Sequence, residues 1–263
     1  MNHKITILLI NLFFLQINLL AQTDNSAPPI KDYTPGILHS LAVGVEYRVK
    51  AGLLMGGTAP IPVPLEIQQI NGYNPLLNIM LEAEVQKSFT NRWALSFGLR
   101  MEQKGMKTQA QVKNYAMELR ESDGSAIVGV WTGGVETTVN NSYLTLPVLV
   151  VWKPAQRWGI KCGGYVSYLL TGTFSGYVQN GYLREGNPTG EKIIIKEESY
   201  NFSRNLAKWN YGIQLGTEFQ AFTHLFAGLD FTWGINSIFP NDFTVMTFAM
   251  HPIYLGLNFG YKF

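Results

Sequence analysis

Cysteine is nearly absent from this sequence of 263 residues, in which Cys162 is the only one. A single thiol cannot form an internal disulfide, so the fold does not depend on oxidative cross-links. Charged residues are also few, at 14%, whereas about a quarter is usual for a soluble domain. The formal net charge of +2 gives no strongly basic surface, and we therefore expect no nucleic-acid partner.

Catalytic and metal-binding motifs are missing as well. The sequence contains no GxxxxGK[ST], no HExxH, no CxxC and no GxSxG. His251 is the one histidine that we weigh as catalytic, because Ser237 and Asp242 lie close to it in the sequence. A lone histidine at the rim of a barrel is more often structural, so we expect no enzyme activity, no cofactor and no metal.

A membrane-spanning helix is excluded beyond the first 21 residues, because no later stretch holds about 18 consecutive apolar residues. Residues 1–21 combine the basic Lys4, an apolar run and the small residue Ala21, which together predict a secretory signal peptide. The alternative is a helical anchor, but polar residues interrupt this run and it is slightly short to span a bilayer. Residues 22–36 are polar and proline-rich and predict a flexible periplasmic leader.

Apolar residues are abundant and follow a period of two. They make up 46% of the sequence, and 13% of all residues are aromatic. Eight segments alternate between an apolar face and a face of glycine, polar or charged residues. They cover 41–49, 77–87, 93–104, 143–152, 158–170, 209–219, 225–235 and 252–263. In an exported chain without a spanning helix, this pattern predicts a membrane β-barrel.

The connections between the segments alternate in length. Short turns at 88–91, 153–157 and 220–224 alternate with long connections at 50–76, 105–142, 171–208 and 236–251. Short turns at one end and long loops at the other are typical of outer-membrane barrels. We therefore predict that residues 37–263 form an all-β, eight-stranded antiparallel up-and-down transmembrane β-barrel with long extracellular hairpin loops, in the bacterial outer membrane. Turn signals near Gly124 and Gly190 predict that the third to sixth segments project beyond the bilayer.

A soluble barrel with an apolar interior is the alternative fold. We favour the membrane barrel because large side chains crowd the apolar face, whereas glycine on the other face suits a crowded lumen. Aromatic residues at the segment ends predict the two interfacial girdles. Those next to the short turns are Trp93, Trp152, Trp158, Phe219 and Phe263, and those assigned to the opposite ends are Tyr47, Tyr143, Tyr168, Trp209 and Trp233.

The predicted lumen face carries acids and bases in nearly equal numbers. The lumen charge network is expected to contain Glu46, Arg48, Glu82, Glu84, Arg100, Glu102, Lys161, Glu218, Asp230 and Lys262, and Lys104 falls on the same face. Near-equal numbers favour mutual pairing, which would fill the lumen of so narrow a barrel and leave no ion pathway. Cys162 is expected to face lipid as a small apolar residue.

Three short segments resemble the PorT-like outer-membrane β-barrel family of Bacteroidota. They are YLTLP at 143–147, GGYVSYLL at 163–170 and GLNFGYKF at 256–263. The resemblance implies an outer-membrane barrel and, through the founding member of the family, a link to protein secretion or surface export. The terminal Phe263 also resembles the C-terminal signal that the outer-membrane assembly machinery reads during insertion.

These features predict a non-enzymatic protein with a structural or interaction role. The expected partners are outer-membrane lipid and lipopolysaccharide, the assembly machinery during insertion, and a protein bound through the extracellular loops. Aromatic residues in the two longest loops are expected on that contact surface, because binding residues concentrate on loops held by a scaffold; they are Tyr115, Trp131, Tyr177, Tyr182 and Tyr200. Two alternatives remain: an enzyme acting on lipid or peptide at the extracellular rim, and a narrow pore.

Overall fold

The computed structural model describes residues 44–120, 126–243, 245 and 248–263. The predicted signal peptide and leader lie outside these residues, as does the predicted start of the first strand at Leu41. Within the described ranges, no helix is long and apolar enough to cross a membrane.

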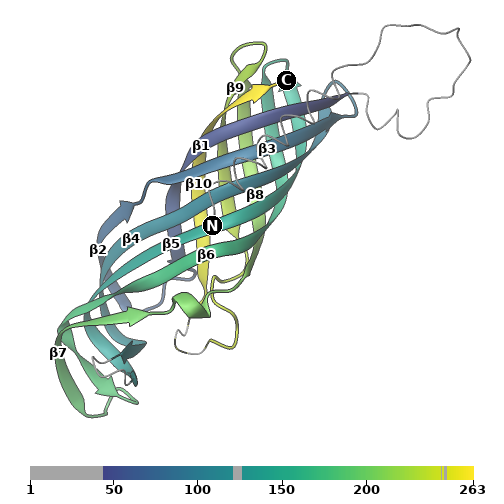
Figure 1. Ribbon diagram of the computed structural model, residues 1–263. Helices are drawn as coiled ribbons and strands as arrows, with labels where there is room; N and C mark the ends of the chain where they lie inside the picture. Colours follow the sequence, from purple (N-terminus) through teal and green to yellow (C-terminus); the bar gives the residue numbers. More distant parts are fainter. Residues whose placement is uncertain (1–43, 121–125, 244, 246–247) are drawn as a thin grey trace, which may run out of the picture. The chain divides into compact units, whose positions relative to one another are not determined.

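Eight strands form a closed antiparallel ring (Figure 1). In chain order they are β1 (Val45–Pro60), β3 (Asn78–Ser88), β4 (Trp93–Arg120), β5 (Ala126–Ala155), β6 (Trp158–Glu185), β8 (Trp209–Gln220), β9 (Leu225–Gly234) and β10 (Met250–Lys262). Each strand pairs with the next one in this order, and β10 returns to pair with β1 from Arg48 opposite Lys262 to Pro60 opposite Met250. A closed ring leaves no unpaired edge, so its backbone groups are satisfied without water. The predicted eight-stranded up-and-down fold is confirmed.

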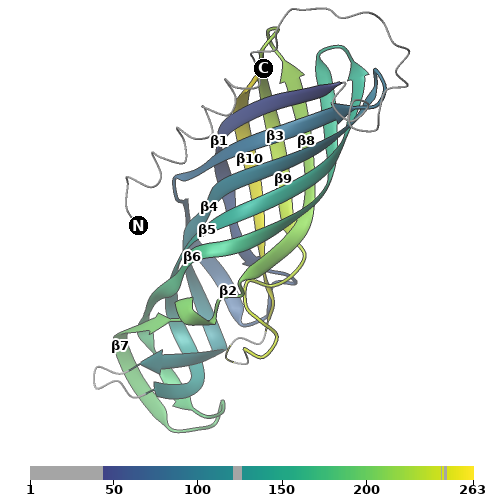
Figure 2. The same cartoon turned by 45° about the vertical axis from the view of Figure 1, so that its right-hand side comes forward.

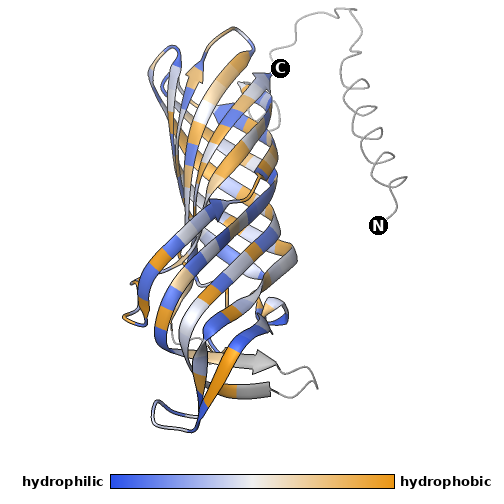
Figure 3. Ribbon diagram, turned by 90° about the vertical axis from the view of Figure 1, so that its left-hand side faces the viewer, coloured by the Kyte–Doolittle hydropathy of each residue, from blue (hydrophilic) through white to orange (hydrophobic). Residues whose placement is uncertain are grey.

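Alternation along each strand decides which side chains enter the ring. In β3, Leu81 on the outer face is 57% exposed, whereas Glu82 beside it is 1% exposed. Figure 3 shows apolar and polar residues alternating along the strands. A ring of eight strands is just wide enough for its own side chains, so inward side chains away from the mouth are buried even where they are charged.

Three strands continue past the ring and build a second part, which we call the extension. β4, β5 and β6 have 28, 30 and 28 residues. β2 (Ile67–Pro75) pairs with β4, and β7 (Lys192–Asn201) pairs with β6. The extension is therefore a sheet in the order β2-β4-β5-β6-β7, and Figures 1 and 2 show it at the end opposite the C-terminus.

The sixth predicted segment does not project as expected. Its strand, β8, begins at Trp209, and the chain before it forms β7 and the short 3-10 helix η1 (Ser203–Asn205). The physical reason is burial, because Phe202 and Leu206 on either side of η1 are 4% and 7% exposed. The prediction of projecting strands therefore holds for the third to fifth segments only.

The interior of the extension is apolar. Its buried core includes Met106, Val112, Tyr115, Met117, Trp131, Val135, Val139, Phe174, Val178, Leu183, Tyr200 and Phe202. Ile238 and Phe239, from the connection after β9, belong to the same core. The inward faces of the same strands are thus charged in the ring and apolar in the extension.

Aromatic residues line both ends of the outer ring surface. At the short-turn end, Trp93 stacks on Trp152 with ring centroids 6.3 Å apart. At the other end, the rings of Tyr168 and Trp209 lie 5.0 Å apart.

Two of the residues assigned to the girdle at this end were wrong. Tyr47 lies at the short-turn end, where its carbonyl accepts the Phe263 N–H at 3.0 Å. Tyr143 is 3% exposed, because its neighbour Leu144 points outward and alternation turns Tyr143 inward.

Candidate functional site

Charged side chains from several strands meet inside the ring, and Glu84 lies at the centre of one group. Its carboxylate is 3.1 Å from Arg48 Nη1 and 3.0 Å from Lys161 Nζ, and it also pairs with Lys50. Register brings them together, because β1 pairs with β3 so that Arg48 lies opposite Glu84 and Lys50 opposite Glu82. All of these side chains are buried, so the charges depend on one another for stabilisation.

A second group continues the network toward the extension. Glu82 lies 2.7 Å from Lys50 Nζ and 2.5 Å from Arg100 Nε. Glu102 lies 3.6 Å from Arg100 Nη1 and 2.9 Å from Lys104 Nζ. Each carboxylate bridges at least two cations, so the ion pairs run without interruption from Arg48 to Lys104.

The remaining candidates of the lumen network lie at its margins. Glu218 joins it through Lys161 at 2.8 Å and through Arg48. Asp230 is buried and accepts a hydrogen bond from Asn258 Nδ2 at 2.8 Å. Glu46 and Lys262 lie at the short-turn mouth as a loose, partly exposed pair 3.9 Å apart.

Lys50 belongs to the network although the period-two pattern predicts an end of the first strand at Val49. The strand continues to Pro60, and Lys50 faces the lumen with a 1% exposed side chain. Continuing the period of two by one position from Arg48 would have found it.

An aromatic layer separates the charged lumen from the apolar core. The Lys104 ammonium lies 5.6, 4.9 and 5.8 Å from the ring centroids of Tyr143, Tyr165 and Tyr254. The faces of aromatic rings attract a cation, so these three rings stabilise the Lys104 ammonium. Lys104 is the last charged residue of the network on the side of the extension. Beyond it lie apolar side chains such as Met106. An ion at this level would lose its partners on entering the core, so the charged part of the lumen ends at Lys104.

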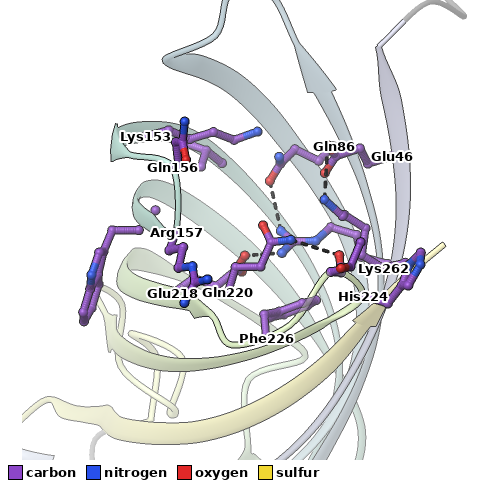
Figure 4. Close-up of a pocket in the computed structure, with 15 residues that line it drawn as sticks. Glu46, Gln86, Lys153, Gln156, Arg157, Glu218, Gln220, His224, Phe226 and Lys262 are labelled. Atoms are coloured by element: carbon purple, nitrogen blue, oxygen red, sulfur yellow. Dashed lines mark hydrogen bonds and ion pairs between the residues drawn. The ribbon is translucent and has the colours of Figure 1, made fainter.

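A small pocket of about 60 Å³ opens at the short-turn mouth. Figure 4 shows Lys153 and Lys262 on opposite sides of it, and Arg48 and Glu218 of the network also line it. The pocket has room for a few water molecules. It is therefore a shallow entrance that ends on the ion pairs.

The two histidines in the described ranges both contact backbone carbonyl groups. His224 Nδ1 lies 2.8 Å from the Lys262 carbonyl, and its ring stacks on Tyr261. His251 Nδ1 lies 3.0 Å from the Gly234 carbonyl. Ser237 Oγ accepts the backbone N–H of Met250 at 3.2 Å, which joins the two ends of the connection between β9 and β10. Over the described ranges, no group of three potential metal ligands is present.

The aromatic residues assigned to the contact surface divide into two groups. Tyr115, Trp131 and Tyr200 are 8%, 0% and 2% exposed and belong to the core of the extension, which corrects that expectation. The cause is that the extension has its own apolar interior, which attracts the large rings. Tyr177 is 47% exposed and Tyr182 is half-buried, so these two remain at the surface.

The terminal Phe263 is 69% exposed, and its ring lies 5.1 Å from that of Tyr261. Its role as an assembly signal stays a prediction.

Gly216→Ala is expected to destabilise the barrel by about 1–3 kcal/mol through crowding of the lumen. A Cβ at this position would overlap Asp230 Oδ1. Gly164→Ala is the matched control, because Gly164 is exposed and the nearest atom to its Cβ would be Gly212 O at 3.4 Å. The control should change stability by less than about 0.5 kcal/mol in urea unfolding from lipid vesicles. Equal losses in both variants would show that lumen crowding is not the cause.

Residues 21–240 match the family model described as outer membrane protein beta-barrel domain. Ail, the attachment invasion locus protein of Yersinia pestis, solved in complex with the heparin analogue sucrose octasulfate, is 11% identical with a TM-score of 0.37, over 84% of this chain and 100% of that chain. OprG, an outer membrane protein of Pseudomonas aeruginosa, is 12% identical with a TM-score of 0.30, over 83% and 95%. Neisserial surface protein A is 8% identical with a TM-score of 0.32, over 84% and 97%. These likenesses concern the fold alone, and no curated protein matches the sequence.

Proposed function

The chain belongs to the outer membrane protein beta-barrel domain family and lies in the bacterial outer membrane, and on that premise we propose that it is a non-enzymatic barrel whose extracellular extension binds a partner. The observation that carries the proposal is the change of interior along the barrel. The ring is filled by ion pairs, and the extension is filled by an apolar core. A filled interior leaves the outer surfaces as the parts that can act on other molecules.

Rigidity of the extension supports a binding role. Trp131, Phe174 and Leu183, from β5 and β6, are at most 1% exposed within its core. A surface held by such a core loses little conformational entropy on binding. The surface can therefore recognise a partner without first becoming ordered.

The alternatives have less support. An enzyme at the rim would need convergent polar groups, whereas His251 and Ser237 are both engaged with backbone atoms. A narrow pore would need a polar path past Lys104, where aromatic rings and Met106 follow. A role in protein secretion or surface export rests on the resemblance to PorT-like proteins, and we propose it only as the context in which the extension would act.

Deleting residues 112–136 and closing β4 and β5 with a short turn tests the proposal. The strands of the ring are untouched, so the variant should still insert. It removes Tyr115 and Trp131 from the core of the extension, and the contact surface should be lost. Proteins crosslinked to the intact chain in native outer membranes should be absent or reduced at least about tenfold with the variant, as for loss of a hot spot.

Asn140→Ala, an exposed change on the retained part of β5, serves as the control and should keep every crosslinked protein. The proposal fails if the deletion variant inserts normally and also retains all of them.

A further inference from the structure

A groove of about 240 Å³ opens on the outer surface of the extension. It is lined chiefly by the amide side chains of Asn71, Gln109, Gln111, Gln179 and Asn180, together with Glu136. They come from β2, β4, β5 and β6. The pairing of β2 with β4 shifts register between Ile70 and Gly72, and Asn180 adopts a φ of 49° in β6. These irregularities occur in the strands that line the groove, where they interrupt the regular sheet surface.

The one carboxylate in the groove is already compensated. Glu136 lies 2.7 Å from Lys107 Nζ and accepts a hydrogen bond from Gln109 Nε2 at 2.8 Å. The hydrogen bonds from Lys107 and Gln109 hold the pKa of Glu136 below its usual range. The carboxylate therefore stays ionised and paired, and the groove carries almost no net charge.

The other four amides have no hydrogen-bond partner among the described residues; they are Asn71, Gln111, Gln179 and Asn180. Each presents one carbonyl acceptor and two N–H donors. A hydroxyl is itself both donor and acceptor, so a surface of free amides matches a ligand rich in hydroxyl groups. Tyr177 lies opposite Glu136 in the β5–β6 pairing and is 47% exposed, and its ring can cover the apolar face of such a ligand.

We propose that this groove binds a neutral saccharide, which names the ligand class of the extension and so rests on the function proposed above. No lysine or arginine lines the groove, and Lys107 beside it is already paired with Glu136, so a phosphate or sulfate would find no unpaired cation there. A peptide that adds a strand needs a free sheet edge. Gln111 and Gln179 stand on β4 and β6, which are paired on both sides here, so strand addition is excluded at these residues.

The test uses the full-length protein in nanodiscs and a set of neutral oligosaccharides: maltohexaose, cellohexaose, laminarihexaose and mannohexaose. At least one should bind in titration calorimetry. The double variant Gln111→Ala/Gln179→Ala should weaken that binding about tenfold or more, the effect of losing one or two net hydrogen bonds. Asn140→Ala, an exposed amide on β5 outside the groove, should leave the affinity unchanged.

Competition then separates two sources of the saccharide. Lipopolysaccharide vesicles that carry a neutral polysaccharide chain displace the oligosaccharide if the ligand belongs to the same membrane, whereas vesicles lacking the chain do not. If neither kind of vesicle competes, the oligosaccharide stands in for a polysaccharide from outside the cell.

The proposal is overturned if none of the four probes binds, if sulfated heparin oligosaccharides alone bind, or if the double variant binds as the parent does. Loss of crosslinked partners on deleting 112–136, without any saccharide binding, would overturn the groove and leave the proposed function standing.

Discussion

Glu84→Gln is expected to destabilise the barrel by about 3–5 kcal/mol, because removing one member of a buried ion-pair cluster leaves uncompensated charge. The carboxylate contacts Arg48, Lys50 and Lys161, and all three cations are buried with it. Glutamine keeps the shape of the side chain and removes only the charge. Urea unfolding from lipid vesicles, followed by tryptophan fluorescence, measures the change in the free energy of unfolding.

Glu46→Gln is the matched control within the same lumen. Its pair with Lys262 is 3.9 Å long and partly exposed, so the loss should be about 0–1 kcal/mol. The double variant Lys50→Met/Glu84→Gln removes one charge of each sign and should recover part of the stability lost in Glu84→Gln. Equal effects of Glu84→Gln and Glu46→Gln would mean that the buried network contributes no more than a surface pair.

Leu215→Arg should impair insertion, with a cost of about 2–4 kcal/mol for a charge at the middle of the lipid face. Leu215 is 47% exposed on the outer face of β8, between the aromatic residues Trp209 and Phe219 near the two ends of that strand. The expected measurement is the fraction of chain that folds into lipid vesicles, seen as the heat-modifiable band on gels.

Thr217→Arg gives a graded control on the same face. Thr217 lies one outward position nearer the short-turn end, where the cost of an arginine should fall toward about 0–1 kcal/mol. Gln214→Leu, on the inner face, would act through the lumen instead, because Gln214 accepts a hydrogen bond from Arg100 at 3.1 Å. If the two arginine variants were equally impaired, depth in the bilayer would not explain the effect.

Period-two alternation predicted the ring well because successive side chains of a strand must point to opposite faces. It could not fix where a strand ends. After Val49, the inward positions of β1 include Gly52 and Leu54 and the outward ones Leu53 and Met55, so the two faces no longer differ in polarity. Because this contrast in polarity fades, the pattern predicts too early an end for the strand and omits Lys50.

Alternation also cannot say which face is the inside. In the ring part of β4, Met101 points outward and Glu102 inward, whereas in its extension Gln111 points outward and Val112 inward. The polarity of the two faces is reversed along a single strand, because lipid surrounds the first part and water the second. Unless the position of this reversal is known, the alternation is equally compatible with Trp131 at the surface and with Trp131 in the core. The expectation that Trp131 lies at the surface was therefore wrong.

The pairing of β1 with β10 has a consequence for how the protein is made. The ring has one seam, and its two sides are the first and the last of the eight strands. Contacts between residues so distant in the chain form slowly, since a long loop must close before they stabilise anything. The barrel therefore cannot be completed strand by strand during synthesis. Until β10 pairs with β1, the edge of β1 is unpaired and inward charges such as Lys50 are not enclosed by the ring. The immature chain must therefore be shielded until the ring closes.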